Sequence, residues 1–191
     1  MPAKKQHRLL EKTIKKNPVY KGGAVDFYVD TVEMINGKTA AREYLNHPGA
    51  VAVLPVLDTG EVILVEQYRY PVGEATLEIP AGKMHRGTDS PLKRAREELR
   101  EETGYTARKI EKLTTFWPCC AFSNEALHIY IATGLVPGKA QPDDDEFLNV
   151  RKMPFEKACR LVETGRLKDS KTIIALQACA IKQLRRAGRT P

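Results

Sequence analysis

The sequence predicts an α+β fold with helices on both sides of the β-structure, an α/β/α sandwich. Most of the regular segments alternate apolar and polar residues with the period of strands, and only a few have helical periodicity. Strand and helix segments are interspersed along 191 residues, a length that suits one domain with an additional arm. Many strands combined with two or three helices indicate a layered domain.

The strands begin with a hairpin near the N-terminus. An alternating run at 25–35 is followed by Asn36-Gly37 and a second run at 38–45. Asn-Gly is a strong hairpin signal because both residues tolerate a positive φ. The other predicted strands are 50–57, 61–69 (joined to it by Asp58-Thr59-Gly60), 75–80, 109–118, 125–135 and 146–153.

One helix is defined by its ends. Ser90 is a candidate N-cap, Pro91 suits the first helical position, and Gly104 follows the last turn, so a helix is predicted over 91–103. The other predicted helices are 154–164, 169–186 and a short N-terminal helix that ends at Lys16-Asn17-Pro18.

Composition narrows the cellular context. No apolar run approaches the roughly 18 residues of a membrane span, and no signal peptide opens the chain, so we expect a cytoplasmic protein without a membrane partner. The net charge of +7 is concentrated at 4–16 and 182–189, which we interpret as solvated ends rather than a nucleic-acid surface. The four cysteines lack paired metal-ligand spacing, and the adjacent Cys119 and Cys120 are expected to be plain reduced thiols rather than a redox pair.

The predicted helix 91–103 carries an unusual concentration of acid. At about 100° per residue, with Glu98 at zero, Glu101 lies at about 300° and Glu102 at about 40°, so these three carboxylates share one face. Such an oxygen-rich cluster suits Mg²⁺ or Mn²⁺. Taken alone, the helix favours the alternative, a solvated acidic face paired with arginines at positions 94, 96 and 100.

The neighbouring residues favour the metal site. Residues 98–105, ELREETGY, resemble the second half of the Nudix box, Glu-apolar-x-Glu-Glu-x-Gly-apolar, and Gly82 matches the first glycine of that pattern. The resemblance implies a loop–helix–loop that holds divalent metal against the diphosphate of a nucleoside diphosphate linked to another group. By the same resemblance Glu98, Glu101 and Glu102 are metal ligands, together with the backbone carbonyl of Ala81.

The segment departs from the Nudix box in three places. One residue is inserted between Gly82 and the helix, Thr88 or Asp89 stands at the first glutamate, and Glu97 replaces an arginine. Arg94 and Arg100 lie three residues on either side of Glu97 and can supply the missing positive charge. These changes leave the metal ligands in place.

The resemblance extends from Val19 to Leu176 and is closest to the ADP-ribose pyrophosphatase branch of the Nudix hydrolases. That branch hydrolyses ADP-ribose to AMP and ribose 5-phosphate as a homodimer with an exchanged N-terminal β-region. We therefore expect residues 1–46 to form a dimerisation arm and 47–191 the hydrolase domain.

Several alternatives stay open at this point. Cys120-Ala121 stands where the branch usually has Pro-Gly, so GDP-mannose or another nucleoside diphosphate sugar is a rival substrate. A catalytically weak Nudix protein that binds nucleotide or RNA is a second possibility, and hydrolysis of RNA caps or nucleoside triphosphates is a third.

The resemblance also implies roles for single residues. Arg69 contacts the diphosphate, and Glu78 supports the metal or substrate site. Glu146 is the expected general base, with Asp145 and Asp144 as alternatives, and Glu98 and Glu102 share in catalysis. The remaining substrate-binding candidates are Arg42 and Glu43 (or a plain cross-strand salt bridge), Tyr28 or Phe27 (or core aromatics), and Glu125.

Overall fold

The computed structural model describes residues 9–85, 90–141, 147–186 and 188. The chain divides into two compact units. The first comprises residues 1–48 and 119–125, and the second comprises residues 49–118 and 126–191.

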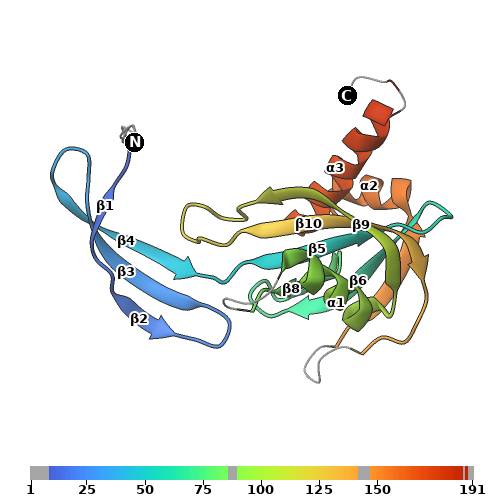
Figure 1. The fold of residues 1–191 in the computed structure, drawn as a ribbon, viewed down its shortest axis with the longest axis horizontal. Coiled ribbons are helices and arrows are strands. Elements are labelled where there is room, and N and C mark those ends of the chain that lie inside the picture. Colours follow the sequence, from blue (N-terminus) through green and yellow to red (C-terminus); the bar gives the residue numbers. More distant parts are fainter. Residues whose placement is uncertain (1–8, 86–89, 142–146, 187, 189–191) are drawn as a thin grey trace. The chain divides into compact units, whose positions relative to one another are not determined.

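The first unit contains a four-stranded antiparallel sheet (Figure 1). Strand β3 (Asp26–Glu33) lies at its centre and pairs with β4 (Thr39–Asn46) along one edge. The other edge of β3 pairs with β1 (Lys12–Lys15) and then β2 (Pro18–Lys21). Gly37 has a φ of 77° in the β3–β4 turn, which confirms the predicted hairpin.

The prediction of an N-terminal helix that ends at Lys16-Asn17-Pro18 is wrong, because the chain forms strands on both sides of Asn17. The N–H of Val29 donates to the Asn17 carbonyl at 2.9 Å, and the N–H of Asn17 donates to Oδ1 of Asp30 at 2.9 Å. Pairing with β3 satisfies backbone groups that an open sheet edge would expose. This long-range demand overrides the weak local preference for a helix.

Two sheets form the framework of the second unit (Figure 1). The first sheet has the order β8-β5-β10-β9, in which β5 and β10 run parallel and the other neighbours antiparallel. The second has the order β11-β6-β7 and is antiparallel. The bounds are β5 Ala50–Pro55, β6 Glu61–Arg69, β7 Glu74–Glu78, β8 Ala81–Lys83, β9 Thr106–Phe116, β10 Leu127–Val136 and β11 Asn149–Pro154.

Strand β5 is buried on both faces, which explains its continuous apolar sequence AVAVLP. Val51 and Val53 pack in a core with Leu99 of helix α1 (Pro91–Thr103). Ala52 and Leu54 belong to a second core, to which α2 (Phe155–Glu163) and α3 (Ser170–Arg186) contribute. Helices thus cover both faces of the sheet, and the predicted α+β fold is confirmed.

The three helices in the described part of the second unit lie where the sequence predicts them, whereas the short strand β8 was not predicted. None of the helices in the described ranges combines the length and apolar character needed to cross a membrane. The four cysteines all lie in the described ranges, and each is a free thiol there.

Candidate active site

Helix α1 buries two of its acidic residues. It begins after Ser90, whose backbone is extended, and ends at Gly104, which has a φ of 76° and donates its N–H to the Arg100 carbonyl at 2.8 Å. Between these ends, Glu98 and Glu102 are each only 3% exposed. Burial of two carboxylates one turn apart is costly unless positive charge or strong donors compensate it.

Arg94 supplies part of that compensation. Its guanidinium forms an ion pair with Glu98 one turn later and lies 3.1 Å from Glu101 through Nη1. The same group is 3.8 Å from Glu97, and Arg100 is 3.6 Å from Glu101. The expectation that Arg94 and Arg100 bring positive charge to this face therefore agrees with the contacts.

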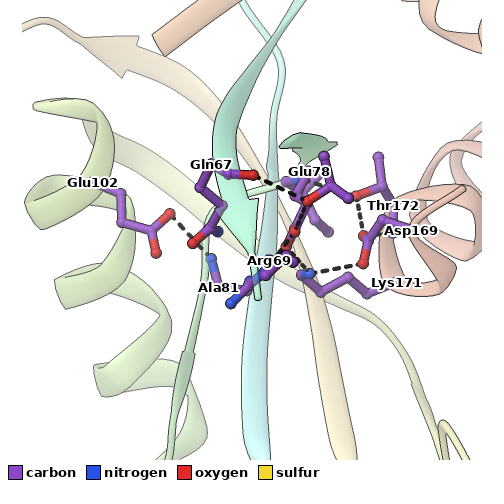
Figure 2. A network of polar contacts seen from close by, with 10 residues as sticks. Gln67, Arg69, Glu78, Ala81, Glu102, Asp169, Lys171 and Thr172 are labelled. Carbon is purple, nitrogen blue, oxygen red and sulfur yellow. Dashed lines mark hydrogen bonds and ion pairs between the residues drawn. The ribbon is translucent and has the colours of Figure 1, made fainter. Parts of the chain in front are cut away.

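The backbone of the short strand β8 lies close to these two buried carboxylates. The N–H of Ala81 donates to Oε2 of Glu102 at 3.4 Å, and Figure 2 shows the two residues facing one another. A Cβ at position 82 would lie 1.5 Å from Oε1 of Glu98, so any residue larger than glycine would displace that carboxylate. The glycine of the box is needed here for close approach, not for an unusual φ.

The donor set suits a hard divalent cation: two buried carboxylates, the half-exposed Glu101 and nearby backbone of β8. Among the described residues, however, no three carboxylate, imidazole or thiol groups are already arranged to hold a metal ion. Arg94 pairs with Oε1 of Glu98 and with Oε2 of Glu101. A cation bound at these two oxygens would compete with the Arg94 guanidinium for them.

Glu78, at the end of β7, is the centre of a second polar cluster (Figure 2). Arg69 of β6 grips it with two parallel hydrogen bonds, Nε to Oε1 and Nη2 to Oε2, each 2.7 Å long. Lys171 and the Thr76 hydroxyl also donate to the carboxylate. Burial alone would raise the pKa of Glu78, but Arg69, Lys171 and Thr76 together lower it from 4.5 to about 2.

The start of α3 completes this cluster. Asp169 accepts a hydrogen bond from the Thr172 N–H at 3.0 Å, as an N-cap residue does, and another from Lys171 Nζ at 2.9 Å. The Thr172 hydroxyl accepts one from the Ile79 N–H at 2.8 Å. The first turn of α3 is thereby bonded to the strand end that leads into Ala81.

The sequence predicts a helix that begins at Asp169, but it did not identify Lys171, Asp169 or Thr172 as parts of a site. One signal was available. A lysine in the first turn of a helix opposes the helix dipole, which favours negative charge there. Such a residue indicates a carboxylate partner elsewhere in the fold.

Four of the predicted substrate-binding residues lie in the first unit. Arg42 donates through Nε to Oε2 of Glu11 at 2.8 Å, and Glu43 is exposed opposite Val29. Tyr28 stacks on Tyr44, with ring centroids 5.4 Å apart. Oε1 of Glu125 lies 3.7 Å from Nδ1 of His47.

The partners of these residues bear on the alternatives left open above. Arg42 pairs with Glu11, the residue just before β1, which agrees with the alternative of a plain salt bridge between segments of the sheet. Phe27 and Tyr28 are half-buried. Glu146, with its alternatives Asp144 and Asp145, and the loop positions Thr88 and Asp89 lie outside the described residues.

Comparison with known proteins places this geometry in a family. A model of the NUDIX domain matches residues 46–176. The ADP-ribose pyrophosphatase of Bacillus subtilis (strain 168) is 44% identical over 177 residues, which cover 92% of this chain and 95% of the relative. The methanol dehydrogenase activator of Bacillus methanolicus is 40% identical, with coverages of 91% and 94%.

Two more distant matches come from sequence and from structure. A GDP-mannose pyrophosphatase of Yersinia enterocolitica serotype O:8 / biotype 1B (strain NCTC 13174 / 8081) is 32% identical, covering 71% of this chain and 75% of the relative. A crystal structure of an ADP compounds hydrolase superposes with a TM-score of 0.81 at 21% identity, over 97% of this chain and 100% of that one. The chain belongs to the NUDIX domain family, whose hydrolases generally use divalent metal ions.

Proposed function

We propose that the protein hydrolyses the diphosphate of ADP-ribose to AMP and ribose 5-phosphate. The observation that carries this proposal is the pair of buried carboxylates, Glu98 and Glu102, held against the β8 backbone in a chain 44% identical to an ADP-ribose pyrophosphatase. GDP-mannose pyrophosphatases are less similar and match a smaller share of the chain, so we rank GDP-mannose second.

Glu98, Glu101, Glu102 and the Ala81 carbonyl would hold Mg²⁺ or Mn²⁺, because all four offer the oxygen ligands that these hard cations prefer. The chemistry that such ions supply is neutralisation of the diphosphate charge and polarisation of phosphorus. The positive charge of the bound ion would also replace the repulsion among the neighbouring carboxylates by attraction to the ion.

The remaining steps are assigned to side chains of this protein. Arg69 is fixed by Glu78 and 42% exposed, so its outward guanidinium edge can bind diphosphate oxygens. Glu146 is proposed to accept the proton of an attacking water. The water oxygen then bonds to one phosphorus, the anhydride P–O bond breaks, and the other phosphate leaves with the bonding electrons.

Hydrolysis of ADP-ribose, GDP-mannose, a nucleoside triphosphate and capped RNA, each with Mg²⁺, tests the substrate. We expect AMP and ribose 5-phosphate from ADP-ribose, with kcat/KM at least about tenfold above the value for GDP-mannose. No turnover of ADP-ribose would contradict the proposal. If the protein bound nucleotide without hydrolysing any of the four, it would instead be a Nudix binding protein.

We also propose that residues 1–46 form an arm exchanged between two copies of the chain, and that the dimer acts in the cytoplasm. Tyr20 and Ile14, in the outer strands of the first unit, are 64% and 53% exposed. Large apolar groups on one sheet are typical of a surface that another chain covers. The exchanged strands would also close the exposed edges.

Sedimentation equilibrium tests this arrangement. We expect the mass of two chains at micromolar concentration, and we expect Tyr20→Asp to shift the equilibrium toward one chain because a buried charge weakens an interface. As a control, Tyr70→Asp changes an exposed tyrosine of the second unit and should leave the mass unchanged. A single-chain mass for the wild-type protein across the concentration range would contradict the dimer.

A further inference from the structure

Lys171 occupies a position that local physics disfavours. It lies in the first turn of the 17-residue helix α3, where positive charge opposes the helix dipole, and it is only 8% exposed. Burying an ammonium group is costly unless it is paired and hydrogen-bonded. Its Nζ meets this condition with two carboxylates, Glu78 and Asp169.

The ion pair with Lys171 is one of four contacts that hold the Glu78 carboxylate in place. Oε1 accepts from Nε of Arg69 and from the Thr76 hydroxyl, while Oε2 accepts from Nη2 of Arg69 and from Lys171. Each oxygen therefore has two donors, and rotation of the carboxylate would break bonds on both sides. The plane of the Arg69 guanidinium is fixed by the same carboxylate, because the two groups meet edge to edge.

The two hydrogen bonds to Glu78 involve Nε and Nη2 of Arg69, and Nη1 lies on the opposite edge of the guanidinium. A cavity of about 630 Å³ is lined by Arg69, Thr76, Glu78 and Lys171, among others. Lys171 is itself anchored, since Asp169 also caps α3 through the N–H of Thr172. The start of α3 is thus bonded to the group that orients Arg69.

We propose that Lys171 is a positioning residue, which holds the Glu78 carboxylate and so fixes the direction in which Arg69 meets the substrate diphosphate. The inference rests on the proposed function, because it takes the diphosphate to be the group that Arg69 binds. Lys171 itself does not touch the substrate. A small misplacement of a binding group is enough to lower affinity or rate strongly.

Steady-state hydrolysis of ADP-ribose tests the role. Lys171→Met is expected to raise KM by about tenfold, because a freely turning Arg69 binds diphosphate less well, and to change kcat by less than about twofold. Lys109→Met is the matched control, since it removes the same charge from an exposed pair with Glu111, 3.0 Å apart. It should leave both constants within about twofold of wild type.

A double-mutant cycle separates positioning from a general loss of positive charge. If Lys171 acts through Glu78, adding Lys171→Met to Glu78→Gln should change KM by less than about twofold beyond the single Glu78→Gln variant. Lys171→Arg retains the charge in a different shape and is expected to raise KM by more than about threefold. This milder variant also decides the question if Lys171→Met fails to fold.

The outcomes distinguish the positioning role of Lys171 from the proposed hydrolysis of ADP-ribose. A wild-type protein that turns over ADP-ribose, combined with an unchanged KM in Lys171→Arg or in a folded Lys171→Met, would overturn the positioning role and leave the proposed function standing. The positioning role would also be overturned if Lys171→Met raised KM by the same factor in the wild-type protein and in the Glu78→Gln variant. No turnover by the wild-type protein would overturn the proposed function and this inference with it.

Discussion

Glu102→Gln is expected to lower kcat for ADP-ribose by more than about 100-fold while the protein stays folded. Loss of an outer-shell partner alone typically costs about 10- to 100-fold at metal sites, and Glu102 is proposed as a ligand itself. The substitution keeps the side-chain size and an acceptor for the Ala81 N–H, 3.4 Å away. Its main effect is to remove the charge that would attract the cation.

Glu97→Gln is the control for this experiment. Glu97 lies on the same helix, is more exposed, and pairs with Lys93 at 3.7 Å and Arg94 at 3.8 Å. We expect its kcat to stay within about twofold of wild type, because Glu97 is not a proposed metal ligand and its ion pairs are partly exposed to solvent. Equal losses in Glu97→Gln and Glu102→Gln would show that general acidity of α1, not a specific ligand, supports activity.

Glu78→Gln is expected to lower the free energy of unfolding by about 3 kcal/mol, the lower part of the range for breaking a buried ion pair, since Arg69 is partly exposed to solvent. The change leaves the buried Lys171 with less compensation. Urea unfolding followed by circular dichroism measures it. The control is Glu66→Gln, which breaks the exposed pair with Arg151 and should cost less than about 1 kcal/mol.

The same pair of variants predicts a pH dependence. Because folding lowers the pKa of Glu78 from 4.5 to about 2, the unfolded chain binds more protons at this residue between those values. The stability that Glu78 contributes is complete above about pH 4.5 and is lost as the pH falls toward 2. Glu78→Gln should therefore lose less stability on acidification than Glu66→Gln. Parallel pH curves for the two variants would contradict the assigned role of Glu78.

Local sequence patterns were sufficient for α1 and its acidic face. Helical periodicity predicted the shared face of Glu98 and Glu102, and the Pro91 and Gly104 signals gave the helix ends. The continuous apolar run of β5 likewise reflects burial on both faces, a property visible in the residues themselves.

The features that local patterns missed all depend on distant partners. Strand β8 has three residues and exists because it pairs with β5, and β1 exists because β3 offers an edge. The ion pair between Glu78 and Lys171 joins residues 93 positions apart. Such pairings are decided by the packed fold rather than by the propensity of either segment.

Mn²⁺ binding, followed by the loss of the electron paramagnetic resonance signal of the hydrated ion, tests the central claim most directly. We predict that the wild-type protein and Glu97→Gln bind Mn²⁺ with similar affinity, whereas Glu98→Gln and Glu102→Gln each weaken binding by at least about tenfold. Equal affinity in all four proteins would contradict the account, because the cation would then be held by residues other than the buried carboxylates of α1.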